Sequence, residues 1–182
     1  MIQRILFVCT GNTCRSAMAE ALFRKMLQDE LGEAAAAIEV LSAGTWTFDG
    51  SAASPNAITV MAEAGIDLSG HRSRQITTDL LQSVDLILTM TEEQKEDVLQ
   101  LAPTVGERLF TLIEFATAVN GLEDSAENDA VSSQNWPASR NINDPYGLSV
   151  ADYRDCAAEI RGYLELVLQK IKGSQRGLDA TP

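Results

Sequence analysis

Cysteine and histidine are scarce in this chain of 182 residues, which has three cysteines and a single histidine, His71. An odd number of cysteines, with Cys9 and Cys14 close together, argues against a structural disulfide framework. One histidine without a paired Cys-x-x-Cys motif is a poor basis for a four-ligand zinc site. The sequence therefore predicts neither a disulfide scaffold nor a metal centre, and no cofactor.

Positively charged residues are also few. Lys and Arg number 14 against 26 Asp and Glu, so the net charge is −12. Because nucleic-acid backbones are held by clusters of Lys and Arg, this balance disfavours a nucleic-acid partner. A local anion pocket remains compatible with an acidic surface.

Long apolar runs are missing as well. No stretch reaches the roughly 18 apolar residues of a membrane-spanning helix, so no membrane partner is expected. The apolar stretch at the N-terminus is too short and too soon interrupted for a signal peptide. We therefore expect a cytoplasmic protein.

Strand-like and helix-like segments alternate along the chain. Short apolar runs predict strands at 4–8, 38–41, 85–90 and 109–112. Apolar spacing and capping residues predict helices over 16–31, from Pro55 toward Gly65, from Thr91, and over 150–171 after Ser149. The alternation predicts an α/β fold with an open parallel sheet, helices on both faces, and ligands beyond the carboxyl ends of the strands.

The length predicts one domain, over residues 1–172. Within it, 119–139 has four acidic residues and no Lys or Arg, which is typical of a mobile surface insertion. A solvated loop is the favoured interpretation of this insertion over a partner-binding role. Residues 173–182 are expected to form a flexible tail.

The segment Cys9-Thr10-Gly11-Asn12-Thr13-Cys14-Arg15-Ser16 lies between the first predicted strand and helix. Backbone N–H groups in such a turn, together with Arg15, can hold an anion and favour a thiolate. Gly11 permits a tight turn, and Ser16 can cap the helix and donate a hydrogen bond to Cys9. The Cys-x5-Arg spacing alone is common, so a buried structural cysteine is the alternative.

A second motif, Asp144-Pro145-Tyr146-Gly147, precedes the last predicted helix. Taken alone, Asp144 is a turn-forming residue before proline. Together, however, the two motifs resemble the active-site loop and the acid motif of the low-molecular-weight protein-tyrosine phosphatases. Ser42-Ala43-Gly44-Thr45 and the pattern His71-x-Ser73-x-Gln75 are similar to further family segments. The resemblance spans roughly residues 3–172 and implies a flavodoxin-like three-layer fold with a four-stranded parallel sheet flanked by helices.

The resemblance implies metal-independent hydrolysis of phosphorylated proteins, with inorganic phosphate or another oxyanion able to bind the loop. Cys9 would attack phosphorus to form a phosphocysteine intermediate, and Arg15 would hold two phosphate oxygens. The N–H groups of 10–15 would bind the remaining charge, and Asp144 would serve as general acid and then as base.

Other residues take supporting roles in this resemblance. His71 matches the position that supports the loop asparagine, here Asn12, and this structural role is favoured over general-base catalysis. Trp46 and Tyr146 are candidate walls of the substrate slot. Tyr146 is the stronger of the two, since Trp46 could be an ordinary half-buried aromatic residue.

Cys14 has two interpretations. It is either a small apolar residue of the loop or, as the resemblance favours, the partner of Cys9 in a reversible disulfide formed on oxidation. Cys156 is expected to serve in packing.

Thr13 bears on specificity. Family members that act on phosphotyrosine often have a bulkier aliphatic residue here, and threonine resembles the bacterial protein-arginine phosphatase branch. We therefore favour phosphoarginine over phosphotyrosine, although Tyr146 would suit either.

Three alternatives remain: a strict protein-tyrosine phosphatase, a thioredoxin-coupled arsenate reductase, and a non-catalytic phosphate-binding module. The reductase needs further relay cysteines, and 88–92, after the third predicted strand, contain none. A binding module should have lost Cys9, Arg15 or Asp144, all of which are present.

Overall fold

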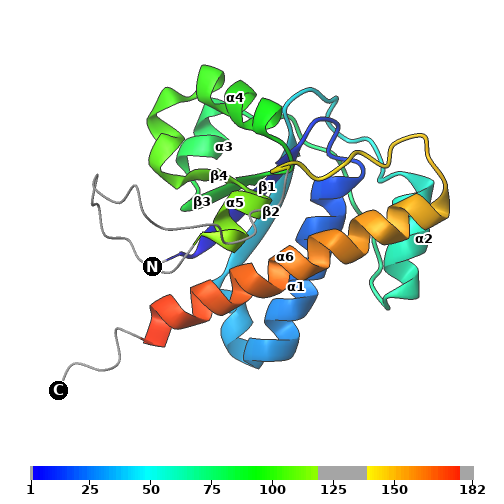
Figure 1. The fold of residues 1–182 in the computed structure, drawn as a ribbon, viewed down its shortest axis with the longest axis horizontal. Coiled ribbons are helices and arrows are strands. Elements are labelled where there is room, and N and C mark those ends of the chain that lie inside the picture. The colour runs from blue at the N-terminus through cyan, green and yellow to red at the C-terminus, as the bar shows by residue number, and fades with distance from the viewer. Residues whose placement is uncertain (1, 119–138, 177–182) are drawn as a thin grey trace.

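The structure, a computed structural model, describes residues 2–118 and 139–176. Its four strands form one parallel sheet in the order β2-β1-β3-β4 (Figure 1). The strands are β1 (Arg4–Cys9), β2 (Glu39–Gly44), β3 (Leu86–Thr89) and β4 (Leu109–Thr111). The predicted α/β fold with a four-stranded parallel sheet is confirmed.

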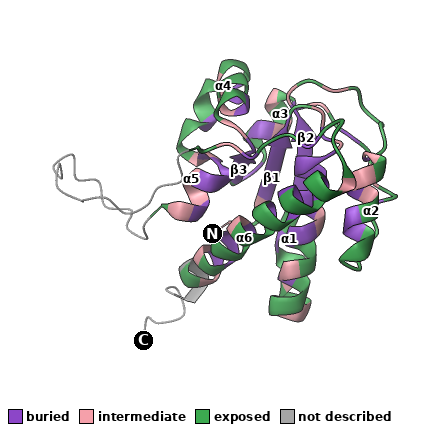
Figure 2. Cartoon of the chain, turned by 45° about the vertical axis from the view of Figure 1, so that its right-hand side comes forward, coloured by how far each residue is buried: buried purple, intermediate pink, exposed green. Residues whose placement is uncertain are grey.

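Helices cover both faces of the sheet, as Figure 2 shows by the burial of the strands between them. Alternate residues of β1 point into different cores: Ile5 and Phe7 pack in one, Leu6 and Val8 in the other. The first core is closed by α1 (Arg15–Leu31), α2 (Pro55–Glu63), α5 (Leu112–Thr117) and α6 (Val150–Arg176). The second is closed by α3 (Thr78–Gln82), α4 (Glu92–Leu101) and the 3₁₀ helix Pro103–Arg108.

The capping predictions for two helices are confirmed. The Ser54 hydroxyl accepts the Ala57 N–H, and Pro55 opens α2. Thr91 and Gln94 form a reciprocal capping box at the start of α4. Gly65 follows α2 with a φ of +74°, a left-handed conformation that glycine adopts without strain.

The prediction that Ser16 caps the first helix is wrong. Helix α1 begins at Arg15 with Cys14 at its N-cap, and no side chain caps it. Ser16 is a buried residue of the first turn, and its hydroxyl contacts Cys9 and Asn12 instead. The requirements of the loop therefore override the usual preference of serine for a cap.

Several boundaries differ from the predictions. Strand β4 ends at Thr111 because Thr111 and Glu114 form a capping box that begins α5 at Leu112. Helix α3, capped by Thr77, and the 3₁₀ helix Gly32–Ala37 were not predicted. Helix α6 continues to Arg176, past Gly173, where the sequence predicts a tail.

The predicted acidic insertion, apart from Ser139, and residues 177–182 of the predicted tail lie outside the described residues. Within the described ranges, no helix combines the length and the apolar character that crossing a membrane requires.

Candidate active site

The loop after β1 is held from outside through its carbonyl groups. The backbone N–H groups of Thr45, Trp46 and Ser54 donate to the carbonyl oxygens of Cys9, Thr10 and Thr13, respectively. The Thr47 hydroxyl donates to the carbonyl of Gly11, and His71 Nε2 donates to the carbonyl of Asn12. By contrast, the N–H groups of Gly11, Thr13, Cys14 and Arg15 have no acceptor among residues 2–118 and 139–176. A tight turn with unused amide donors, at the start of a helix, is suited to hold an anion.

Gly44 allows the loop to approach β2 closely. A Cβ atom at this position would lie 2.5 Å from the carbonyl oxygen of Thr10. The residue thus lets the loop settle over the carboxyl ends of β1 and β2, where the topology predicts a ligand site.

Cys9 lies at the base of this loop and is only 2% exposed. Its Sγ atom is 2.9 Å from the Ser16 hydroxyl and accepts the Asn12 N–H at 3.2 Å. Two polar groups therefore contact this buried sulfur, and the thiolate is the nucleophilic form of a cysteine.

Asn12 lies at the centre of the hydrogen bonds that hold the loop. It is fully buried and has a φ of +52°, the left-handed conformation that asparagine tolerates better than most residues. Its Oδ1 accepts the Arg74 N–H at 2.9 Å, which fixes the orientation of the amide. Its Nδ2 therefore donates to the hydroxyls of Ser16 and Ser42, at 2.9 and 2.8 Å.

This orientation decides where the two hydroxyl protons go. Both oxygens accept from Asn12, so each hydroxyl proton is free for another acceptor. The Ser42 hydroxyl donates to the carboxylate of Glu20, which also pairs with Arg24 at 2.7 Å. The Ser16 hydroxyl has two acceptors in reach, Cys9 Sγ at 2.9 Å and the Ala43 carbonyl oxygen at 3.5 Å, and the shorter contact is the one to the sulfur.

His71 lies where the resemblance implies. Its Nε2 is 2.7 Å from the backbone carbonyl oxygen of Asn12, so Nε2 is the protonated nitrogen. The contact ties His71 to the backbone of the loop.

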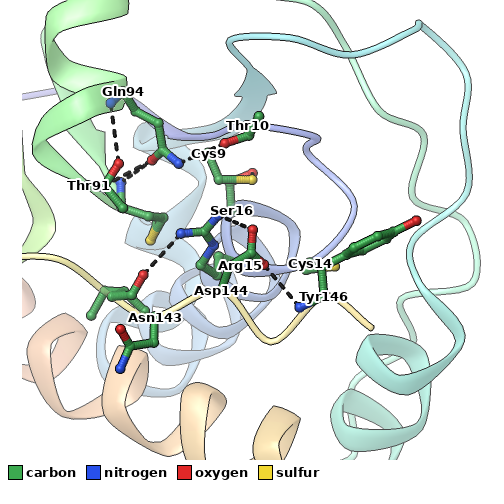
Figure 3. A network of polar contacts seen from close by, with 12 residues as sticks. Cys9, Thr10, Cys14, Arg15, Ser16, Thr91, Gln94, Asn143, Asp144 and Tyr146 are labelled. Atoms are coloured by element: carbon green, nitrogen blue, oxygen red, sulfur yellow. Dashed lines mark hydrogen bonds and ion pairs between the residues drawn. The ribbon is translucent and has the colours of Figure 1, made fainter. Parts of the chain in front are cut away.

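Arg15 and Asp144 meet across the mouth of the loop (Figure 3). Arg15 is 4% exposed, and its Nη2 is 2.5 Å from Asp144 Oδ2. Its Nη1 donates to the carbonyl of Ile142 at 3.0 Å. Its Nε is buried without a hydrogen-bond partner in the part of the chain that the structure describes, so this N–H is available to a ligand.

The segment that carries Asp144 is anchored on the sheet. The Ile142 N–H donates to the carbonyl of Met90, just after β3, and the Glu92 N–H donates to the Asn141 side chain. The Asp144 carboxylate also accepts the N–H of Tyr146 at 3.1 Å, a local turn contact. The two motifs seen in the sequence are thereby brought together.

The rim of the loop carries two exposed aromatic side chains. Trp46 is 80% exposed and Tyr146 is 71% exposed. The alternative of a half-buried Trp46 is therefore wrong, because its ring lies outside both cores. Thr10 is exposed on the same rim, and Thr13 is half-buried with its hydroxyl 3.6 Å from Cys14 Sγ.

The other two cysteines are buried and free. Cys14 Sγ lies 3.2 Å from the Tyr153 hydroxyl, and burial, with this contact, raises the pKa of Tyr153 to about 12. Burial likewise raises the pKa of Cys156 to about 12, so its thiol is protonated at neutral pH. Cys156 packs in the larger core, as predicted.

Three supporting residues escaped the sequence reasoning. Glu20 completes the buried network through Ser42, and Gln94 donates to the Thr10 hydroxyl at 3.1 Å (Figure 3). The sequence offered a signal for Ser42, which lies in a segment similar to the family. The sequence indicated Gln94 only as a capping residue of α4, whereas its side chain both caps α4 and donates to the active-site loop.

The described residues contain no group of three or more His, Cys, Asp or Glu side chains that could hold a metal ion.

Comparison with known proteins places this site in a family. A family model for low molecular weight phosphotyrosine protein phosphatases matches residues 4–176. The protein-arginine-phosphatase of Bacillus subtilis (strain 168) is 31% identical over 172 residues, which cover 94% of this chain and 99% of that protein. The probable low molecular weight protein-tyrosine-phosphatase EpsP of Ralstonia nicotianae is 42% identical over 112 residues, 62% of this chain and 72% of that protein.

Arsenate reductases are also similar: that of Halalkalibacterium halodurans is 32% identical over 151 residues, 83% of this chain and 94% of that protein. Among solved structures, the YwlE arginine phosphatase from Geobacillus stearothermophilus superposes with a TM-score of 0.77 at 31% identity, covering 99% of this chain and 98% of that one. This chain belongs to the low molecular weight phosphotyrosine protein phosphatase family and is a protein phosphatase.

Proposed function

We propose that this phosphatase hydrolyses phosphoarginine on proteins through a phosphocysteine intermediate on Cys9. The observation that carries the mechanism is the loop itself: a buried cysteine with two hydrogen-bond donors on its sulfur, beside unused amide donors and a buried guanidinium. Thr13 carries the choice of substrate.

In the first step the Cys9 thiolate forms a bond to phosphorus while the bond from phosphorus to the leaving group breaks. The leaving nitrogen or oxygen takes a proton from the carboxylic acid form of Asp144, which forms by uptake of a proton from solvent once the phosphoryl group has displaced the carboxylate from Arg15. In the second step water attacks phosphorus, Asp144 accepts a proton from that water, and the S–P bond breaks to return the thiolate and release phosphate. The Ser16 hydroxyl and the Asn12 N–H stabilise the thiolate before it attacks phosphorus in the first step and after it is released in the second.

Charge on the phosphoryl oxygens is taken up by the loop amides and Arg15. The unpartnered Nε and the Nη2 of Arg15 form a two-donor fork that matches two phosphate oxygens. Nη2 is engaged by Asp144, so an incoming phosphoryl group replaces that carboxylate on the guanidinium. The displaced Asp144 is then close to the departing group, where a general acid is needed.

The choice of phosphoarginine rests on Thr13 and on the relatives. Its hydroxyl, at the half-buried loop position, can hydrogen-bond a polar guanidinium leaving group, whereas an aliphatic side chain would pack on a phenol ring. The arginine phosphatases of Bacillus subtilis and Geobacillus stearothermophilus, which match this chain over nearly its whole length, support this substrate. Phosphotyrosine is the competing substrate, favoured by the higher identity to EpsP and by exposed aromatic rings at the rim.

The decisive test compares kcat/KM for phosphoarginine and phosphotyrosine peptides of the same sequence, with Cys9→Ser as the blank. The native enzyme should prefer phosphoarginine, and Thr13→Ile should move the ratio toward phosphotyrosine. Thr59→Ile, on the exposed face of α2, is the matched control. Preference for phosphotyrosine in the native enzyme, unchanged by Thr13→Ile, would reject the assignment.

Arsenate reduction is less well supported. A thiol relay needs a third nucleophilic cysteine, and Cys156 is the only one left in the sequence. Its thiol is buried, with a pKa raised to about 12 by that burial, so it is a poor nucleophile at neutral pH.

A further inference from the structure

A second cavity lies beside the active-site loop. It has a volume of about 650 Å³ and is bordered by α1 and by the segment 65–74. It shares with the active site four residues that support the loop, while Cys9, Arg15 and Asp144 do not line it; the shared residues are Glu20, Ser42, His71 and Arg74. The cavity is therefore distinct from the place where the phosphoryl group reacts.

Positive charge gathers around this cavity in a chain whose net charge is −12. Four cations line it, against two carboxylates; they are Arg24, Lys25, Arg72 and Arg74, facing Glu20 and Asp67. A local excess of positive charge in an acidic protein attracts anions selectively to that point of the surface.

Two of these cations are not neutralised. Arg24 pairs with Glu20, and Lys25 pairs with Asp29. Arg72 donates only to backbone carbonyls, of Ser69 and His71, which do not cancel its charge. The guanidinium of Arg74 has no hydrogen-bond or ion-pair partner within the described ranges.

We propose that this cavity binds a small molecule carrying a diphosphate or two phosphate groups. Two guanidinium groups, each able to donate to two oxygens at once, match such an anion better than a single carboxylate. The volume lies within the usual range for sites of small organic ligands, roughly 300–1,000 Å³, and Ile66 and Leu68 add apolar lining. In an organic diphosphate, the phosphate groups would bind the two guanidinium groups and the organic part would contact the apolar lining.

The site has a direct connection to the active-site loop. The backbone of Arg74 donates to Asn12 Oδ1, and His71 donates to the Asn12 carbonyl. A ligand held by Arg72 and Arg74 therefore binds the segment that positions Asn12. The amide signal of Asn12 should report binding in either site.

The test is a titration of the isotopically labelled protein, followed by the backbone amide signals in NMR spectra. The probes are inorganic pyrophosphate and adenosine 5′-diphosphate, each added to the native chain, to the double variant Arg72→Gln/Arg74→Gln, and to Arg161→Gln. Arg161 is an exposed cation of α6, paired with Glu165, and serves as the control for loss of an exposed arginine away from the cavity.

We expect the amides of 65–72 to shift saturably in the native chain and in Arg161→Gln, and not in the double variant. The amides of Thr13 and Cys14 should shift in all three proteins because the active-site loop also binds phosphate groups, and this response shows that the double variant is folded. If adenosine 5′-diphosphate binds with a lower Kd than inorganic pyrophosphate, the ligand of the cavity is an organic diphosphate. If the two Kd values are equal, the ligand is the free diphosphate.

Either of two results would overturn the second site: no saturable shift in 65–72 of the native chain, or the same shift in the double variant. Loss of the response at Thr13 and Cys14 alone would instead count against the proposed function of the loop, so the two failures are distinguishable.

Discussion

Arg15 and Asp144 form an ion pair across the mouth of the active-site loop, with 2.5 Å between Nη2 and Oδ2. Arg15 is buried, whereas the Asp144 side chain is 46% exposed. The carboxylate thus occupies one of the donors that a phosphoryl group needs. Asp144 therefore competes with substrate for Arg15, and in the proposed mechanism it also supplies the proton for the reaction.

Asp144→Asn should therefore separate binding from turnover. Phosphate should bind roughly tenfold more tightly, since a hydrogen bond to a charged group is worth about 1.5–3 kcal/mol and partial exposure of the pair reduces that value. The kcat for a substrate with a poor leaving group should fall by about 10²-fold or more. Phosphate inhibition constants and steady-state kinetics measure the two effects.

The matched control for that variant is Asp152→Asn, which removes a carboxylate bonded to Ser149 at the start of α6. It should change neither value. Unaltered phosphate affinity together with full turnover in Asp144→Asn would contradict both roles.

Arg15→Lys keeps the positive charge but loses the planar fork. Because one of two charge-assisted hydrogen bonds to the phosphoryl group is lost, kcat/KM should fall roughly 10- to 100-fold. A variant with native kcat/KM would show that only the charge matters at this position. Circular dichroism should confirm that the variant is folded, since Arg15 is buried.

Asn12 should contribute to stability through both its backbone and its amide. Asn12→Ala removes three buried side-chain hydrogen bonds and places alanine at a φ of +52°, so the free energy of unfolding should fall by about 2–4 kcal/mol. Asn12→Gly loses the same bonds without the backbone strain and should be about 1 kcal/mol more stable than Asn12→Ala. Urea unfolding measures both; equal stability of the two variants would argue against backbone strain.

The three cysteines should differ in reactivity. At neutral pH a thiol-alkylating reagent should label Cys9 and spare Cys156, whose buried thiol has its pKa raised to about 12. Because the folded-state pKa exceeds the ordinary value of 9.0, the contribution of Cys156 to stability is complete below pH 9 and is lost as the pH rises toward 12. Cys156→Ala should therefore flatten the alkaline fall in stability, and rapid labelling of native Cys156 would contradict this burial.

Oxidation gives a separate prediction for Cys14. Peroxide should inactivate the enzyme, and a thiol should restore it, if oxidation joins Cys9 to Cys14 in a disulfide, because that bond would protect the nucleophile from irreversible oxidation. Cys14→Ser should lose that recovery. Equal recovery in the variant would reject the disulfide.

Features that depend on local sequence could be predicted. Apolar periodicity and capping residues located the strands and most helices, and the Cys9 and Asp144 motifs located the two halves of the candidate site. Features that depend on tertiary contacts could not be predicted. The meeting of Arg15 with Asp144, and the buried chain from Asn12 through Ser42 to Glu20, depend on segments that only the folded sheet brings together.

Ser16 illustrates the same limit within a single turn. Its residue type and position favour a helix cap, yet its hydroxyl is committed to Cys9 and Asn12. A local preference of about 1 kcal/mol is readily overridden by a buried hydrogen-bond network.

The central claim, that Cys9 carries the phosphoryl group, is tested most directly by trapping the intermediate. The enzyme is mixed with a phosphorylated peptide, quenched in acid within one turnover, digested and analysed by mass spectrometry. The account predicts one phosphoryl group on the sulfur of Cys9, and neither the group nor turnover in Cys9→Ser. A phosphoryl group on another residue, or undiminished turnover by Cys9→Ser, would contradict it.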